Sequence, residues 1–195
     1  MSTTRDLTEG NPFKLIILFM LPMFFGNIFQ QFYNLVDALI VGRTIGLKAL
    51  AAVGATGPLI FLIIAFIFAS TQGFSVVTAQ KFGAKEYDMV RKSTAASFIL
   101  SFLLTVIMTL ISAPFTMPML KLLQTPSDII YLANDYLFIM YIGIGATVFY
   151  NVSSNIIRAL GDSKTPLYFL IFSSILNIFL DLLFILKFNM GVSGA

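Results

Sequence analysis

The feature that most constrains this chain is the spacing of its charged residues, which leaves five long uncharged runs. These runs contain 22, 32, 28, 22 and 16 residues and lie within 15–36, 49–80, 93–120, 136–157 and 165–180. A helix that crosses a bilayer needs about 20 mostly apolar residues, and only helices and closed barrels satisfy the backbone in lipid. The runs lack the alternation of barrel strands, so the sequence predicts an all-α, polytopic transmembrane helix bundle.

Composition excludes several classes of function. Charged residues make up 11% of the 195 residues and hydrophobic ones 58%, whereas soluble domains are about 25% charged. The chain has no Cys and no His, which excludes disulfides, thiolate chemistry and His-based metal sites. We therefore expect no metal centre and no cofactor. The net charge of +3 is explained by contact with anionic membrane lipid, so we expect no nucleic acid partner.

Five helices fit the runs, at about 13–42, 49–79, 93–115, 130–158 and 165–188, and together form one lobe over residues 1–195. Gly161 suits a helix end, with Thr165 as the next N-cap and Pro166 as the first helical residue. The small residues after Lys187 are typical of the start of a sixth packed helix. We therefore expect the sequence to be truncated before helix six.

Lysine and arginine placement predicts the orientation. If the N-terminus is cytoplasmic, the inner segments carry eight of these residues and the outer segments four. Cytoplasmic loops are enriched in Lys and Arg, so we expect a cytoplasmic N-terminus. The polar start, Met1–Asn11, does not resemble a signal peptide, and helix one should remain as a span.

Polar side chains recur at three- and four-residue spacing on three of the predicted helices. They include Gln30, Asn34 and Asp37 on helix one, Asn151 and Asn155 on helix four, and Asn177 and Asp181 on helix five. Such spacing puts side chains on one helix face, where they either line a wet cavity or pack helices together. We predict that Gln30, Asn34 and Asn151 line a cavity.

Asp37 and Asp181 are the two acids that fall inside predicted spans, at similar depth in the outer half. Two carboxylates at one level can share a proton, or can hold Na⁺ together with the amide oxygen of Asn177. The alternative is that both acids are solvated at the membrane interface, because Arg43 and Lys187 follow six residues later. Pro22, in the first third of helix one, predicts either a hinge or a static kink.

Two stretches carry a family resemblance. Residues 31–42, with 50–54 after them, resemble the first helix and following turn of the MATE (multidrug and toxic compound extrusion) transporters. Residues 155–166, running on to 177–181, resemble helix four, the cytoplasmic turn and helix five of that family, in its bacterial DinF-like branch. The run Arg-Ala-Leu-Gly-Asp-Ser-Lys-Thr-Pro at 158–166 is the most specific part.

The resemblance implies a fold of twelve helices in two lobes, of which this chain would be the N-terminal one, with the second lobe as its partner. It implies an antiporter of the cell (plasma) membrane that exports drug-like, often cationic, organic molecules as H⁺ or Na⁺ enters. It also implies a cation site formed by Asp37, Asn177 and Asp181, joined by Asn155 from helix four. A helix-one proline bends in mechanisms proposed for the family, which favours Pro22 as a hinge.

Three other functions stay open on the sequence. A membrane-embedded lipid-modifying enzyme would use Asp37 and Asp181 as acid and base, but no metal-binding or nucleophilic cluster accompanies them. A lipid-linked flippase needs a cationic cavity for phosphate, and Arg158 is the one base near a span face. A subunit without transport activity is the third. We expect a transporter and not an enzyme.

Overall fold

A computed structural model describes residues 10–188 and 190–194, which contain helices and no strand. The long helices are α1 (Pro12–Thr44), α2 (Leu47–Gly83) and α3 (Tyr87–Ser112), and a 3₁₀ turn, η1 (Ala113–Phe115), leads from α3 into α4 (Thr116–Leu122). The second half contains α5 (Ile130–Ile142), α6 (Ile144–Ala159), α7 (Thr165–Leu182), the π-helical turn η2 (Leu183–Lys187) and the 3₁₀ turn η3 (Gly191–Gly194). The all-α prediction is confirmed.

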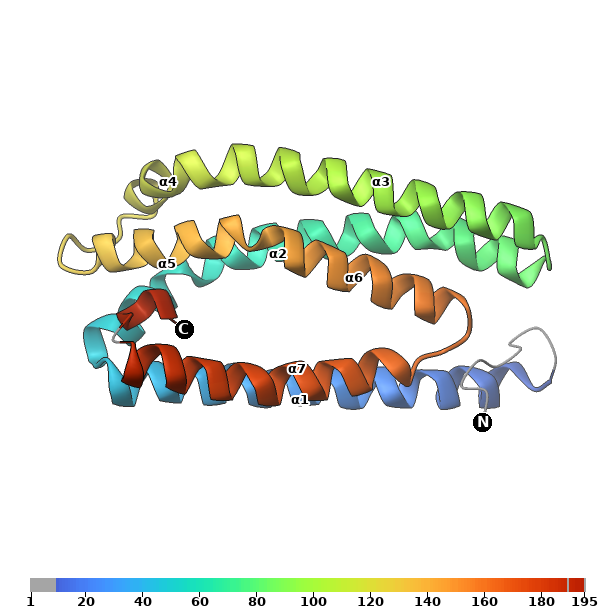
Figure 1. Ribbon diagram of the computed structural model, residues 1–195, viewed down its shortest axis with the longest axis horizontal. Coiled ribbons are helices and arrows are strands. Elements are labelled where there is room, and N and C mark those ends of the chain that lie inside the picture. Colours follow the sequence, from blue (N-terminus) through green and yellow to red (C-terminus); the bar gives the residue numbers. More distant parts are fainter. Residues whose placement is uncertain (1–9, 189, 195) are drawn as a thin grey trace.

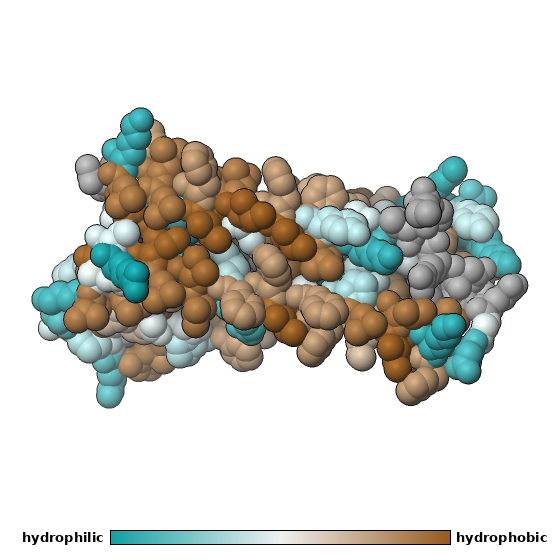
Figure 2. All heavy atoms as spheres, turned by 90° about the horizontal axis from the view of Figure 1, so that it is seen from below, coloured by the Kyte–Doolittle hydropathy of each residue, from teal (hydrophilic) through white to brown (hydrophobic). Residues whose placement is uncertain are grey.

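Four of these helical segments are long and apolar enough to cross a membrane, and α5 with α6 makes a fifth if the bent pair is one span. The face of the molecule in Figure 2 is hydrophobic across its middle, and hydrophilic side chains gather at its two ends. That distribution suits a bilayer with water on both sides. The predicted multi-pass bundle is therefore confirmed.

The helices form two groups. α2 packs against α3, α5 and α6, and α1 packs along α7 (Figure 1). The core of the larger group consists of buried apolar side chains from α2, α4, α5 and α6, among them Ile67, Leu120, Leu137 and Val148. α6 and α7 follow one another in sequence, and they diverge from their shared turn toward the junction of α5 and α6 (Figure 1). The α1–α7 pair therefore forms a separate layer of the bundle.

Hydrogen bonds connect the helices of the larger group. Thr78 donates to Ser93 at 3.0 Å between α2 and α3, and Thr116 donates to Asn134 at 2.7 Å between α4 and α5. Within the described part of the chain, one inter-helix hydrogen bond connects this group to the α1–α7 pair. It runs from the hydroxyl of Tyr150 to the carbonyl oxygen of Pro166, at 3.4 Å. The pair is therefore held against the group mainly by apolar contacts.

The predicted helix 130–158 is broken. α5 and α6 meet at Gly143 with a bend of 45°. At the break the N–H of Ala146 bonds to the carbonyl of Gly143, and the hydroxyl of Thr109 donates to the carbonyl of Tyr141 at 3.4 Å. A side chain from α3 thus satisfies a carbonyl that the break removes from the helical ladder, as broken helices in membranes require.

The third and fifth predicted spans also differ from their expected bounds. α3 begins at Tyr87 instead of residue 93, so its first turns carry the charged residues Asp88, Arg91 and Lys92. Its span continues through η1 and α4 to Leu122. The fifth span ends as the π-helical turn η2, directly after α7.

The turn between α6 and α7 is built by Gly161 and Asp162. Gly161 has φ +86° and its N–H bonds to the carbonyl of Arg158, while the N–H of Asp162 bonds to the carbonyl of Ile157, a pattern that ends helices with glycine. The Asp162 carboxylate accepts from the N–H of Lys164 at 2.9 Å and of Thr165 at 3.0 Å. The helix end at Gly161 is confirmed. The prediction of Thr165 as N-cap is wrong, because Thr165 is already helical and Asp162 makes the cap bonds.

We expect Asp162→Ala to lower the free energy of unfolding by about 1–2 kcal/mol, because it removes the acceptor for two orphan N–H groups of α7. Asp162→Asn keeps an acceptor and should lose less. Thermal melting of the purified protein measures both, with the exposed Asp128→Ala as control. Equal melting temperatures for Asp162→Ala and Asp128→Ala would contradict the capping role.

Candidate cation-binding site

α1 and α7 bring the two intramembrane acids together. Asp37 lies two turns before the end of α1, and Asp181 lies in the last turn of α7. The helices approach closely at Gly26, which is buried; a Cβ there would lie 3.6 Å from the Leu167 side chain and 3.7 Å from that of Leu170. Gly26 therefore leaves room at this contact for a methyl group and for little more.

The two carboxyl groups lie close enough to interact electrostatically. Asp181 is 3% exposed and Asp37 is half-buried. Oδ1 of Asp37 and Oδ2 of Asp181 are buried and have no hydrogen-bond partner. Unsatisfied acid oxygens in an apolar setting carry a large free-energy penalty. A proton or a small cation shared by the two acids would remove this penalty.

Asn177 adds a third oxygen to this pair. It lies four residues before Asp181 on α7, which places both side chains on one face of the helix. Its Oδ1 is also buried without a hydrogen-bond partner. The structure thus places unpaired oxygens of Asp37, Asn177 and Asp181 on two adjacent helices, α1 and α7.

Two tyrosines complete the surroundings, and the sequence analysis did not select them. Tyr33 lies four residues before Asp37 on α1, and Tyr136 comes from α5 and is 8% exposed. Both hydroxyls are close enough to interact electrostatically with Asp37 and Asp181. The four-residue spacing could have identified Tyr33. Tyr136 had no comparable signal, because only the fold brings α5 to the α1–α7 pair.

Asn155 is not brought to this pair. It lies four residues before the end of α6, close to the turn from which α7 starts, whereas Asp181 lies 16 residues into α7. At 1.5 Å per residue the two differ by about 18 Å along the bundle. The Asn155 amide instead donates to Thr71 at 3.2 Å and accepts from Arg158 at 3.4 Å.

The other predicted residues lie on different surfaces. Gln30 and Asn34 are exposed on α1, while Asn151 is 4% exposed and donates to the carbonyl of Thr147 at 2.8 Å. Pro22 is half-buried inside α1, which continues through it as one helix (Figure 1). The structure therefore separates the exposed amides of α1 from the buried amide of α6.

The chemistry of the ligand set favours a small cation. Two carboxylates, one amide oxygen and neighbouring tyrosine hydroxyls are hard oxygen ligands, which suit H⁺ or Na⁺. In the described part of the chain, no three His, Cys, Asp or Glu side chains come together as a metal-binding group. The arrangement can thus bind one monovalent charge between two transmembrane helices.

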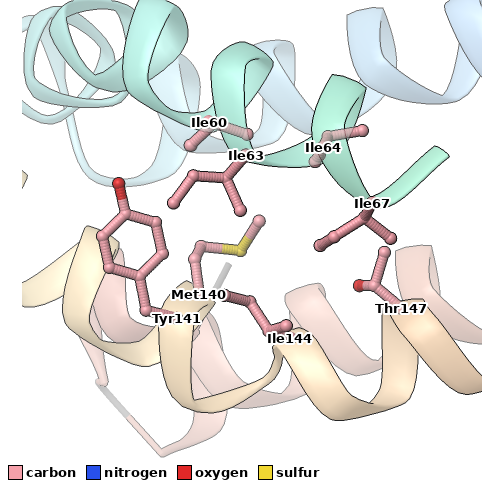
Figure 3. Close-up of a pocket in the computed structure, with 8 residues that line it drawn as sticks. All are labelled: Ile60, Ile63, Ile64, Ile67, Met140, Tyr141, Ile144 and Thr147. Atoms are coloured by element: carbon pink, nitrogen blue, oxygen red, sulfur yellow. The ribbon is translucent and has the colours of Figure 1, made fainter. Parts of the chain in front are cut away.

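A separate small cavity lies between α2 and the junction of α5 and α6. Figure 3 shows the side chains of Ile63, Ile67, Met140 and Ile144 facing one another across it. The cavity has a volume of about 20 Å³, whereas sites for drug-sized ligands have volumes of about 300–1,000 Å³. It is therefore too small for a drug-sized molecule.

Comparison with known proteins agrees with the fold. Residues 22–183 match the MatE family. The chain is 36% identical over 190 residues to a protein named probable multidrug resistance protein YpnP of Bacillus subtilis, covering 97% of this chain and 43% of that protein. The chain therefore spans less than half the length of this relative.

Solved structures show the same fold. A MATE structure in the bent conformation superposes with a TM-score of 0.89 at 32% identity, covering 99% of this chain and 43% of the other. A MATE structure in the straight conformation gives 0.86 at 32% identity, covering 97% and 42%. The family match covers most of the chain, and the fold agrees with it. The chain belongs to the MatE family.

Proposed function

We propose that this chain is the N-terminal lobe of a secondary antiporter that exports drug-like, often cationic, organic compounds in exchange for H⁺ or Na⁺. The observation that carries the proposal is the pair of buried carboxyl groups on α1 and α7, with oxygens that lack hydrogen-bond partners. The relative named as a multidrug resistance protein supports the export of drugs. A solved relative, similar at a TM-score of 0.87 and 32% identity, is described as a multidrug resistance MATE family transporter, which supports a transporter over an enzyme.

The cation would bind between Asp37 and Asp181, with Asn177 as an additional oxygen ligand. Two carboxylates in contact repel one another, and burial in an apolar bundle strengthens that repulsion. A proton shared by the pair, or Na⁺ held by the three side chains, removes it. Tyr33 and Tyr136 would then donate hydrogen bonds to whichever acid oxygens remain negatively charged.

Cation binding would reach the substrate through α1. Pro22 lacks the N–H that completes the helical ladder and is a natural point of bending. Gly26, one turn later, is packed against α7. We propose that neutralising the acids draws α1 toward α7 and changes its curvature at Pro22. Solved relatives in bent and in straight conformations support a family with two such states. Export then requires that binding of the cation lowers the affinity for the substrate, and the reverse.

The exposed amides of α1 would line the substrate cavity. Gln30 and Asn34 are exposed in this lobe, although amides are costly to expose to lipid. A second lobe facing α1 would enclose them in a polar cavity. This chain covers 43% of the relative's length, so the rest of a protein of that length could form such a lobe. Asn151 would contribute from α6 only if it left its bond to Thr147.

We further propose that the protein lies in the plasma membrane with a cytoplasmic N-terminus. The ends of α2 and α6 and the starts of α1, α3 and α7 lie at one end of the bundle (Figure 1). Seven described bases lie there, namely Lys14, Lys81, Lys85, Arg91, Lys92, Arg158 and Lys164. This excess fits the enrichment of Lys and Arg on the cytoplasmic side.

The experiment is uptake of a fluorescent organic cation into inside-out vesicles that contain the protein as its gene encodes it, because in such vesicles an exporter moves its substrate into the lumen. We expect transport that stops when the driving gradient is collapsed, by a protonophore for H⁺ or by a sodium ionophore for Na⁺. Vesicles without the protein provide the background. Transport that survives the collapse of both gradients would contradict the antiport proposal, and lipid scrambling without dye transport would favour a flippase.

A further inference from the structure

The segment that follows α7 folds back into the bundle near the acid pair. α7 contains Asp181 in its last turn, and η2 and η3 come directly after it. η3 packs against α5 and η2, and it lies between α5 and the α1–α7 pair, at the end of the bundle where α1 passes into α2 (Figure 1). That end lies opposite the seven bases, so it is the outer end in the proposed orientation.

Val192 is the residue of η3 that closes this end. It is 3% exposed and belongs to an apolar cluster with Val41 of α1, Ala49 of α2 and Tyr136 of α5. Val41 lies one turn beyond Asp37 toward the outer end of α1. The hydroxyl of Tyr136 is close enough to both acids to interact with them electrostatically. The cluster therefore lies between the acids and the outer end of the bundle.

The other end of η3 fits closely against η2. A Cβ at Gly194 would lie 3.0 Å from the Cβ of Phe184 and 3.0 Å from that of Met190, whereas carbon atoms pack at about 3.5–4.0 Å. Gly191, at the start of η3, has φ +61°, which glycine adopts without strain. The turn is therefore seated on η2 by a fit that an added methyl group would disturb.

η3 is the part of this closure that costs least to move. Val41, Ala49 and Tyr136 belong to helices of 33, 37 and 13 residues, whereas η3 has four. Among the described residues, the backbone hydrogen bond that holds the start of this segment to η2 runs from the N–H of Met190 to the carbonyl of Phe184, at 3.1 Å. Short segments with few hydrogen bonds open at a lower free-energy cost than packed helices. Opening at this end would therefore start with η3.

We propose that η3 is a lid over the cation site and that Val192 is the side chain that seals it. Oδ1 of Asp37 and Oδ2 of Asp181 are buried and have no hydrogen-bond partner while the lid is closed. A cation from the outer side reaches them after Val192 leaves its place beside Tyr136. The inference rests on the proposed function, because the lid controls access to that cation site.

The experiment measures how fast a permanently charged carbodiimide modifies Asp37 and Asp181 when it is added outside right-side-out vesicles that contain the natural protein. Peptide mass spectrometry counts the modified carboxyl groups. We expect modification about tenfold faster in Val192→Ala, because closure of the lid then loses the burial of two methyl groups. Gly194→Ala, which displaces the lid from Phe184, should also react faster, and it provides the test if Val192→Ala does not fold.

Two further variants serve as controls. Val192→Ile keeps a branched apolar side chain and should react no faster than the wild type. Val152→Ala is the matched control, since Val152 is a fully buried valine on α6 outside the cluster, and it should react at the wild-type rate. A difference confined to Val192→Ala and Gly194→Ala would therefore assign the closure to η3.

Three results would overturn the lid. The first is an equal rate in the wild type, Val192→Ala and Gly194→Ala. The second is an equal acceleration in Val152→Ala, which would show general loosening of the bundle. The third is an acceleration of the same size when the reagent reaches the inner side of the membrane in inside-out vesicles. Modification needs no transport, so faster reaction in the lid variants of a protein that transports no dye would support the lid and contradict the antiport proposal.

Discussion

Asp181→Asn is expected to abolish gradient-driven efflux while leaving the fold at least as stable as before. Asparagine has the shape of aspartate but carries no charge, so it cannot exchange H⁺ or neutralise Na⁺. Loss of a charged hydrogen-bonding partner amounts to about 1.5–3 kcal/mol, so we expect gradient-driven dye transport to fall about 10- to 100-fold. Vesicle dye transport under an imposed gradient measures this loss.

The same substitution, Asp181→Asn, should leave the thermal stability unchanged or raise it. Asp181 has a buried oxygen without a partner beside a second acid, and its neutralisation relieves that repulsion. The melting temperature of Asp181→Asn should therefore equal or exceed that of the wild type. Asp128→Asn, at an exposed acid that pairs with Lys48, is the control and should keep normal transport. Gradient-driven efflux that persists in Asp181→Asn would exclude the pair as the coupling site.

Gly26→Phe is expected to cause the second large loss, through packing instead of charge. A phenyl ring at this position has to enter the space occupied by Leu167 and Leu170 on α7. Overpacking of this kind costs about 1–3 kcal/mol and pushes α1 away from α7, which separates Asp37 from Asp181. We therefore expect the variant to melt at a lower temperature and to lose dye efflux.

Two glycine variants show whether the loss comes from this contact. At Gly26 a single methyl group meets its neighbours at ordinary van der Waals distance, so Gly26→Ala should transport nearly as well as the wild type. Gly54 lies on an exposed face of α2 with nothing within 4 Å of an added Cβ, so Gly54→Phe should also remain active. A loss in Gly54→Phe equal to that in Gly26→Phe would show a general effect of aromatic substitution.

The spans could be predicted from the sequence because they depend on a single physical rule. Charges are excluded from lipid, so the gaps between charged residues mark the membrane segments whatever their packing. The rule fails at the edges of spans, where helices continue into water: α3 extends back over Asp88, Arg91 and Lys92. It also gives no sign of the bend at Gly143, since apolar residues flank the break and no proline lies there.

The candidate site was predictable only in part. Spacing identifies side chains that share one helix face, so it selected Asp37, Asn177 and Asp181. It cannot say which faces of different helices meet. Asn155 has the same residue type and spacing, yet α6 turns it toward Thr71 and Arg158, and Tyr136 reaches the acids from α5 through tertiary packing alone.

The sparse polar contact between the α1–α7 pair and the other helices determines how this lobe can deform. Both acids lie on the pair, so they travel together, and their separation is preserved if the pair slides or tilts as a rigid unit. Tyr136 belongs to the other helix group, so such a displacement would change the distance from its hydroxyl to the two carboxyl groups. Among the described residues, the inter-helix hydrogen bond that it would break is the one from Tyr150 to Pro166. In such a displacement the two acids of the candidate site would stay together while their contact with Tyr136 changes.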